Sequence, residues 1–211
     1  MTKRIIFITF SFIVISNITA LSQNFKFGIV AGLDIAKSRY SKIPNAFSGS
    51  QSYNPMIAYN FNGYIGYKKS DSWGFSIEPG FIQKGGKQKI SNETYVRLNL
   101  NYLQLPILLD YYIFKKLYIS LGPELSYLHS AKLKSKEISN NITDSIYKRF
   151  ELSGIIGLNY KITDYFDIGI RYNHGLTYTS KISWFDDSGK DLGESNEYNQ
   201  YVQLNVKYKI F

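Results

Sequence analysis

The sequence has no cysteine and only two histidines among its 211 residues. The lack of cysteine excludes a disulfide scaffold, a thiolate metal site, a cysteine nucleophile and a lipoprotein anchor. Charged residues are also few, at 19% of the chain, whereas 17% of the residues are aromatic. Such an aromatic content argues against intrinsic disorder. The length allows one domain or at most two small ones.

Residues 1–22 have the features of a secretory signal peptide. The positively charged pair Lys3 and Arg4 precedes an apolar run that is shorter than the roughly 20 residues needed by a membrane-spanning helix. Small residues at the end of the segment predict cleavage before Gln23, and an uncleaved anchor helix is the alternative. We expect residues 23–211 to form one exported domain that has no helix able to cross a bilayer.

From residue 25 onward, apolar and polar residues alternate with a period of two, which places successive side chains on opposite faces of a β-strand. Eight runs show this pattern, and in seven of them no charged residue falls on the apolar face. The runs cover residues 25–36, 60–67, 73–84, 96–112, 117–127, 150–160, 166–173 and 202–210.

The run 96–112 breaks the alternation. Leu98, Leu100 and Tyr102 share one face, but from Leu103 the apolar residues occupy odd positions. One extra residue near Tyr102 would restore a continuous apolar face, and a β-bulge supplies such a residue. We therefore expect a bulge at this point.

Three prolines, Pro79, Pro106 and Pro123, lie inside strand runs. A closed barrel has no free edge at which a missing backbone donor would be harmless. We therefore expect local bulges or strand ends at the prolines.

Short and long connections alternate along the chain. The short ones are residues 68–72, 113–116 and 161–164, and the long, polar ones are residues 39–58, 86–95, 129–148 and 179–199. Both chain ends and all short turns then lie on one side. The pattern predicts an all-β fold: an eight-stranded antiparallel up-and-down transmembrane barrel with periplasmic turns and longer external loops.

The polar face favours a membrane barrel over a soluble one. A soluble barrel would turn a densely charged face to water, but here that face is mostly Gly, Ser, Asn and Tyr. Turning Lys26 or Arg171 toward lipid would cost roughly 2–4 kcal/mol near the middle of the membrane. We expect the apolar face to contact acyl chains and the polar face to fill the interior, in the outer membrane.

Aromatic residues gather beside the short turns. A girdle at the periplasmic interface would account for them, because amphipathic rings are favoured at headgroup depth. Ordinary β-propensity explains any single one of them but not their clustering at one end. The residues are Tyr67, Trp73, Tyr111, Tyr112, Phe114, Tyr118, Tyr160, Tyr165 and Phe166.

Four short motifs occur in order along the strands: Phe81–Gly85, Tyr102–Pro106, Gly122–Glu124 and Gly169–Leu176. Together they resemble the PorT-like outer-membrane β-barrel proteins, also described as porin-family barrels, over about residues 25–211. The resemblance implies an outer-membrane location. It carries over no enzymatic activity, and a secretion- or envelope-related role stays open.

The last residue, Phe211, resembles the terminal aromatic that outer-membrane barrels present to the barrel assembly machinery. It is out of phase with Tyr208 and Ile210, which share the apolar face of the final run. Either Ile210 or Phe211 could therefore complete the girdle.

Glu78, Glu124 and Arg171 should face inward at similar distances from their short turns. We expect them to meet near the middle of the barrel as a buried ionic cluster. An eight-stranded barrel is just wide enough to be filled by side chains. The prediction is a plugged lumen and a non-enzymatic, structural or partner-binding protein, with a narrow channel for small solutes as one alternative.

The other alternative is a membrane-embedded enzyme using His129 or His174 with a serine and an acid. Neither histidine has a recognisable nucleophile motif beside it, so a rim position is favoured for both. Residues 186–191 only faintly resemble a calcium loop, since Lys190 and the spacing fail the EF-hand pattern. The sequence also has no glycine-rich phosphate loop, so we expect no catalytic site, metal or cofactor.

Positive charges concentrate in and beside the second and third long loops, whereas the fourth is acidic. At an outer rim the cations would face the phosphates of lipopolysaccharide, and a solvated charge run is the simpler interpretation of both loops. The expected partners are outer-membrane lipid and lipopolysaccharide, the assembly machinery and an envelope protein, with no nucleic acid. The cations are Lys84, Lys87, Lys89, Arg97, Lys132, Lys134, Lys136, Lys148 and Arg149, and the acids are Asp186, Asp187, Asp191, Glu194 and Glu197.

Overall fold

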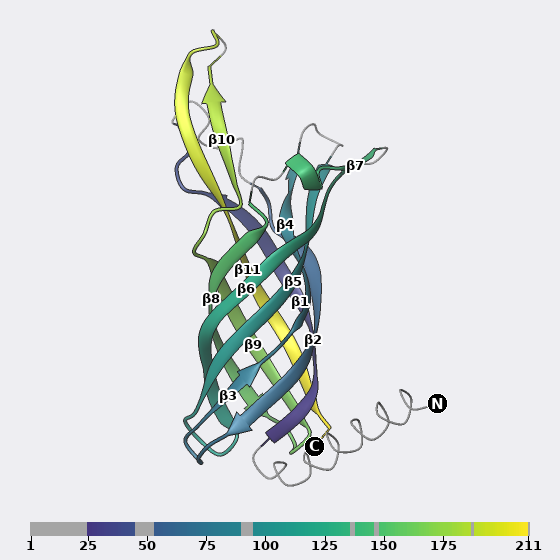
Figure 1. The fold of residues 1–211 in the computed structure, drawn as a ribbon, viewed down its shortest axis with the longest axis vertical. Coiled ribbons are helices and arrows are strands. Elements are labelled where there is room, and N and C mark those ends of the chain that lie inside the picture. Colours follow the sequence, from purple (N-terminus) through teal and green to yellow (C-terminus); the bar gives the residue numbers. More distant parts are fainter. Residues whose placement is uncertain are drawn as a thin grey trace, which may run out of the picture.

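The structure is a computed structural model, shown in Figure 1. The expected signal segment 1–22 and the terminal Phe211 lie outside the residues it describes. The described residues are 25–44, 53–89, 95–135, 138–145, 148–186 and 188–210.

Nearly all regular structure is β-strand, and the 3₁₀ turn Thr143–Ser145 is the helical element among the named segments. Within the described ranges, no helix is both long enough and apolar enough to cross a membrane. The strands are β1 (Phe25–Tyr40), β2 (Met56–Lys68), β3 (Trp73–Ile77), β4 (Gly80–Lys89), β5 (Tyr95–Tyr112), β6 (Leu117–Lys134), β7 (Ser139–Asn141), β8 (Phe150–Lys161), β9 (Phe166–Gly175), β10 (Ser180–Phe185) and β11 (Asp191–Lys209).

The strands close into a ring of antiparallel neighbours (Figure 1). β1 pairs with both β2 and β11, so the first and last strands join. β3 and β4 together form one wall between β2 and β5, and the ring continues through β6, β8 and β9 to β11. The predicted eight-stranded antiparallel barrel is therefore confirmed.

Pro79 divides the third wall into β3 and β4. The neighbouring strands cover the gap, since the amide of Gly63 donates to the Pro79 carbonyl at 2.8 Å and that of Glu78 donates to the Pro106 carbonyl at 3.0 Å. The expected bulge or strand end was wrong at Pro106 and Pro123. β5 and β6 run through both prolines, and their register is unchanged between the Pro106–Glu124 pair and the Leu109–Leu121 pair.

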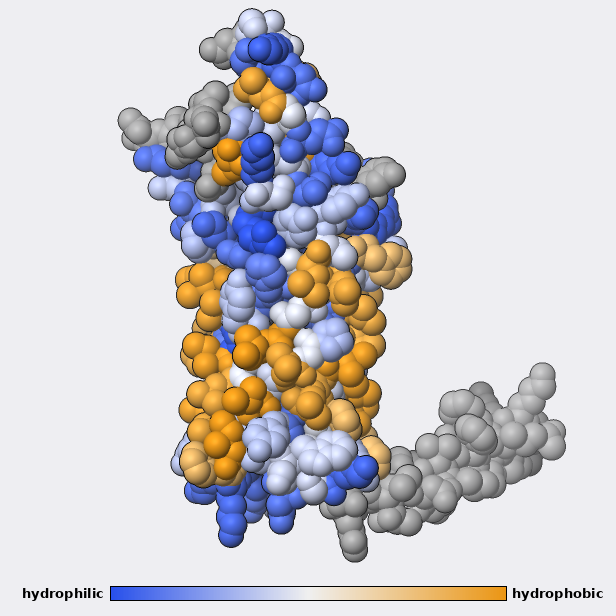
Figure 2. Space-filling model, turned by 90° about the vertical axis from the view of Figure 1, so that its left-hand side faces the viewer, coloured by the Kyte–Doolittle hydropathy of each residue, from blue (hydrophilic) through white to orange (hydrophobic). Residues whose placement is uncertain are grey.

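The lower barrel turns apolar side chains outward and polar ones inward, as the alternation predicts. Leu33, Phe61 and Leu204 expose 63%, 55% and 62% of their surface, whereas Asn60 and Gln203 are buried. Figure 2 shows the outward side chains as an orange band around the lower part of the molecule, with hydrophilic surface above it. Such a band is what a bilayer-spanning barrel presents to acyl chains.

The expected bulge lies beside Tyr102, but it neither adds a residue to β5 nor restores the apolar face of that strand. Residues at even positions face inward along β5, so Leu98, Leu100 and Tyr102 are buried and no extra residue shifts the pattern. The register does shift beside Tyr102, but the extra residue is His129 on β6, since Asn101 pairs with Ser130 and Tyr102 with Leu128.

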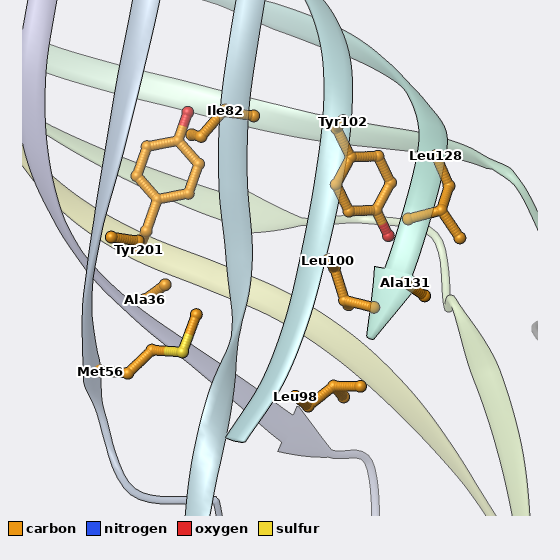
Figure 3. Close-up of a cluster of buried hydrophobic side chains, with 10 residues drawn as sticks. Ala36, Met56, Ile82, Leu98, Leu100, Tyr102, Leu128, Ala131 and Tyr201 are labelled. Carbon is orange, nitrogen blue, oxygen red and sulfur yellow. The ribbon is translucent and has the colours of Figure 1, made fainter. Parts of the chain in front are cut away.

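The change of apolar face along β5 marks a change of surroundings. Above the orange band the barrel wall meets water, so apolar residues turn inward there, as they do in soluble barrels. They form an apolar layer inside the upper barrel, much of which Figure 3 shows as sticks. Its members are Ala36, Met56, Ala58, Ile82, Leu98, Leu100, Tyr102, Leu128, Ala131 and Tyr201.

Two hairpins extend the barrel on the side of the long connections. β10 pairs with the first half of β11, from Ser180 opposite Glu197 to Phe185 opposite Asp191. This arm rises beyond the ring in Figure 1. The short β7 pairs with the end of β6. Both hairpins lie opposite the short turns that join β2 to β3, β5 to β6 and β8 to β9.

Candidate functional site: the barrel interior

A buried ion pair crosses the lower lumen. The guanidinium of Arg171 on β9 donates two hydrogen bonds to the carboxylate of Glu78, at 2.5 and 2.8 Å. The ammonium of Lys207 on β11 lies 3.4 Å from the same carboxylate. Because the three side chains are at most 2% exposed, this lower cluster (Glu78, Arg171 and Lys207) is shielded from solvent.

A second cluster lies nearer the apolar layer. The ammonium of Lys84 on β4 contacts carboxylate oxygens of Glu124 and Glu151 at 2.7 and 2.9 Å. The hydroxyl of Tyr201 donates to the other oxygen of Glu124 at 2.5 Å, and the amide of Asn199 donates to Glu151 at 2.7 Å. In this upper cluster (Lys84, Glu124 and Glu151), two buried carboxylates share one cation.

The sequence analysis placed Glu78, Glu124 and Arg171 in one cluster, but the structure assigns Glu124 to the other. Barrel strands are tilted and staggered, so equal distances from the turns do not give equal heights. On β8, Glu124 lies opposite Ser153 and Arg171 opposite Gly157, four residues further on. At about 3.3 Å per residue, the offset along β8 is about 13 Å.

Sequence reasoning missed Lys84, Glu151 and Lys207 as cluster members. The signal was present, because all three occupy the inward positions of their alternating runs. The assignment of Lys84 to a basic outer rim was wrong, because its side chain is 1% exposed and paired inside the lumen. Only the closed ring shows which inward residues meet.

The lower mouth of the lumen holds a third ionic group. Lys209 donates to the Asp167 carboxylate at 2.7 and 2.9 Å, and the Tyr118 hydroxyl donates to the same group at 2.7 Å. Tyr118 is 2% exposed, and the ring of Tyr112 packs on it with centroids 5.0 Å apart. Both tyrosines hold inward positions at a strand end, so their assignment to the outer girdle was wrong.

Other aromatic residues of the expected girdle do lie on the outside. Tyr111, Tyr160 and Phe166 expose 55%, 45% and 43% of their surface, and Phe114 and Tyr165 are also exposed. Ring pairs join neighbouring strands at this end, Phe25 with Tyr67 and Phe166 with Tyr208, at 4.9 and 4.8 Å between centroids. Trp73 packs edge-on against Phe75 of its own strand at 5.2 Å.

The two histidines lie on the outer wall. His174 has Arg39 and Tyr172 as hydrogen-bond partners, each at 3.0 Å from a ring nitrogen. His129 is exposed at the register shift of β6. Neither histidine has a serine among its hydrogen-bond partners in the described part of the chain.

The fourth long connection forms the β10–β11 hairpin, and Asp186 lies at its turn. One oxygen of Asp186 accepts from the hydroxyl of Ser188 at 2.6 Å and from the amide of Lys190 at 2.9 Å, and these bonds hold the pKa of Asp186 below its ordinary value. Asp187 lies outside the described residues. Over the described ranges, no group of three or more His, Asp and Glu side chains could hold a metal ion.

Most charged side chains of the long loops are exposed, as expected for solvated runs, but one acid, Glu197, is buried. Lys89, Arg97, Lys132, Lys134 and Arg149 are exposed, Lys87 and Lys148 are half-buried, and Lys136 lies outside the described residues. Among the acids, Glu197 is only 5% exposed. It lies opposite Ser180 at the base of the β10–β11 arm, and burial raises its pKa above the ordinary value. Its surroundings are therefore those of a site rather than of a solvated surface.

Sequence comparison decides the family. The model of the family described as "Outer membrane protein beta-barrel domain" matches residues 21–181. The chain belongs to this family. Its apolar band and closed ring agree with that membership, and its location is the outer membrane. No curated protein matches the chain significantly.

Several solved structures of outer-membrane proteins are similar to the chain at low identity. Neisserial surface protein A (NspA) has a TM-score of 0.52 and 16% identity, over 87% of this chain and 97% of that one. Ail of Yersinia pestis has a TM-score of 0.48 and 14% identity, over 89% and 100%. OprG of Pseudomonas aeruginosa has a TM-score of 0.47 and 14% identity, over 89% of this chain and 96% of that one. At such identities, the NspA match supports the barrel fold alone.

A charge placed in the band should be costly. Leu204 is 62% exposed on β11, and we expect Leu204→Lys to lower the free energy of unfolding by about 2–4 kcal/mol, because the ammonium would lie among acyl chains. Urea titration in lipid vesicles would measure the change. The control Asn140→Lys, on exposed β7 outside the band, should change it by less than about 0.5 kcal/mol.

Proposed function

We propose that this protein is a closed, non-enzymatic outer-membrane barrel whose part above the bilayer binds a partner in the cell envelope. Within this proposal, the likeness to PorT-like barrels favours a secretion- or envelope-related role. Lipopolysaccharide is the expected lipid neighbour of the exposed cations Arg97, Lys132 and Lys134 on β5 and β6.

The filled lumen is the observation that carries the proposal. Two salt-bridged clusters span its lower and middle parts, and the apolar layer lies above them. Inward side chains at different heights, such as Tyr102, Gln203 and Leu108, are at most 2% exposed, so the interior is filled around each of them. Such packing supports a barrel that passes no solute.

The extension above the band supports the binding role. The strand walls continue past the apolar belt, and the β10–β11 arm rises further (Figures 1 and 2). At the base of the arm the Thr179 amide donates to the Glu197 carbonyl at 2.8 Å, and further along the arm the Trp184 indole donates to Ser195 at 2.7 Å. A rigid, raised surface of this kind suits a partner held away from the membrane.

Planar bilayer recordings test the closed lumen. The purified barrel should show no steady ion current, whereas a general diffusion porin reconstituted in the same way should conduct. Steady single-channel steps from the wild-type barrel would favour the narrow channel instead.

Crosslinking on whole cells tests the binding role. A photo-crosslinking residue at exposed Ser188, on the arm, should capture a discrete envelope partner, and one at exposed Phe114, at a short turn, should not capture the same partner. Identical adducts at both ends would contradict a role for the external extension.

A further inference from the structure

A cavity of about 240 Å³ lies at the loop end of the barrel, next to the apolar layer. Apolar side chains, among them Leu98 of β5, Leu133 of β6 and Ile142, form part of its wall. Ser180 and Glu197, from the base of the β10–β11 arm, supply polar groups. Its volume is below the roughly 300 Å³ at which ligand pockets usually start, so it suits a small ligand.

Glu197 brings an incompletely paired carboxylate to this cavity. One oxygen, Oε2, accepts a hydrogen bond from the hydroxyl of Ser180 at 2.6 Å. The Ser38 hydroxyl also acts on this carboxylate and offsets part of the rise in its pKa, and it donates to Asn199 at 3.4 Å. The other oxygen, Oε1, is buried and has no hydrogen-bond partner among the described residues. Leaving such an oxygen unpaired costs free energy, so the site favours a donor.

The nearest lysine of the cavity does not supply that donor. Lys181 also lines the cavity, but its ammonium lies 3.4 Å from Glu194, and the two side chains are about half exposed on the arm. Within the part of the chain that the structure describes, no salt bridge involves Glu197. The negative charge at the cavity is therefore not balanced by a neighbouring cation.

Aromatic rings lie beside the carboxylate. Tyr53 lines the cavity, its ring centroid is 6.1 Å from that of Tyr40, and Tyr40 in turn packs edge-on against Trp184 at 5.8 Å. The faces of aromatic rings attract cations, most strongly where water is excluded. A carboxylate, a tyrosine ring and an aliphatic wall together select a group that is cationic at one end and apolar at the other.

We propose that this cavity binds a small amphipathic amine, with its ammonium group donating to Oε1 of Glu197 and its apolar chain against Leu98 and Leu133. A carboxylic acid would be repelled by Glu197. A neutral apolar molecule would leave Oε1 unpaired. The inference is independent of the proposed partner-binding role, because the ligand would enter the mouth of a barrel that stays closed below.

Tryptophan fluorescence of the barrel in lipid nanodiscs tests the proposal. The chain has two tryptophans, so Trp73→Phe leaves Trp184, near the cavity, as the reporter. Titration with n-pentylamine at neutral pH should give a saturable change in emission. Binding of n-pentanol should be at least tenfold weaker, and Glu197→Gln should weaken n-pentylamine binding at least tenfold while leaving n-pentanol unchanged.

Matched variants distinguish binding of the probes at the cavity from their partitioning into lipid. Glu194→Gln removes an exposed acid of the same arm and should bind n-pentylamine like the parent. Leu133→Phe narrows the cavity and should weaken both probes, and mobility on unboiled gels reports whether each variant is folded. Equal n-pentylamine titrations of the parent and folded Glu197→Gln, or equal affinities for amine and alcohol, would overturn the proposal.

One further variant tests Lys181 as a built-in partner. Lys181→Met should bind n-pentylamine at least as tightly as the parent. If only this variant binds, Lys181 already neutralises Glu197 in the native protein, and the proposal fails.

Discussion

Replacing Lys84 by methionine is expected to lower the free energy of unfolding by about 5 kcal/mol, the upper end for breaking a buried ion pair. Its ammonium is the cation shared by Glu124 and Glu151, at 2.7 and 2.9 Å, and all three groups are at most 3% exposed. Without it, two carboxylates would face each other away from water. The remaining donors, such as Tyr201 and Asn199, are neutral.

Urea unfolding in lipid vesicles, followed by mobility on unboiled gels, would measure this loss. The double variant Lys84→Met with Glu124→Gln should recover much of it, because Glu151 keeps the donors Ser153 and Asn199 at 3.1 and 2.7 Å. Lys68→Met, which removes an exposed turn cation, should have an effect of less than about 1 kcal/mol. A Lys84→Met barrel as stable as the wild type would show that the upper cluster contributes nothing.

Arg171→Met should cost about 3 kcal/mol, the lower end of the same range. The substitution removes both hydrogen bonds to Glu78, but Lys207 remains 3.4 Å from that carboxylate and compensates part of its charge. On unboiled gels, the folded, fast-migrating fraction should fall at a urea concentration that leaves the wild type folded. Arg171→Ala should act in the same direction.

An exposed ion pair, Arg149 with Asp144, serves as the control for the buried pair of Arg171 and Glu78. Arg149 contacts Asp144 at 2.9 Å, and these side chains are 42% and 97% exposed, so Arg149→Met should change the stability by less than about 1 kcal/mol. Adding Glu78→Gln to Arg171→Met should recover only part of the loss, because the buried carboxylate is then gone but the buried Lys207 ammonium loses its contact with Glu78. An unchanged folded fraction in Arg171→Met would reject the lower cluster as a stabilising group.

The two ionic clusters lie at different heights in the lumen. Because one lies near Gly157 and the other near Ser153 along β8, salt-bridged side chains fill successive heights of the barrel. The apolar layer begins just above, where Tyr102 and Tyr201 belong to it and approach the polar groups through their hydroxyls. The polar filling therefore passes directly into an apolar one.

The sequence determined the strand count, the closed topology and the side of each strand that faces lipid. These follow from periodicity and from the alternation of short and long connections, both of which are local properties of the chain. The inward position of Glu78 and the outward position of Leu204 could be predicted in this way, because a one-residue shift would expose every polar side chain of the strand to lipid.

Tertiary structure alone decided which inward residues meet. The stagger of tilted strands separates Arg171 from Glu124 and brings Lys84 to Glu124, residues that lie on different strands. It also decided where the wall leaves the bilayer, and hence why Leu98 turns inward while Leu103 turns outward on the same strand. Contacts across a barrel depend on the closure of the whole ring, and no local pattern in the sequence contains that information.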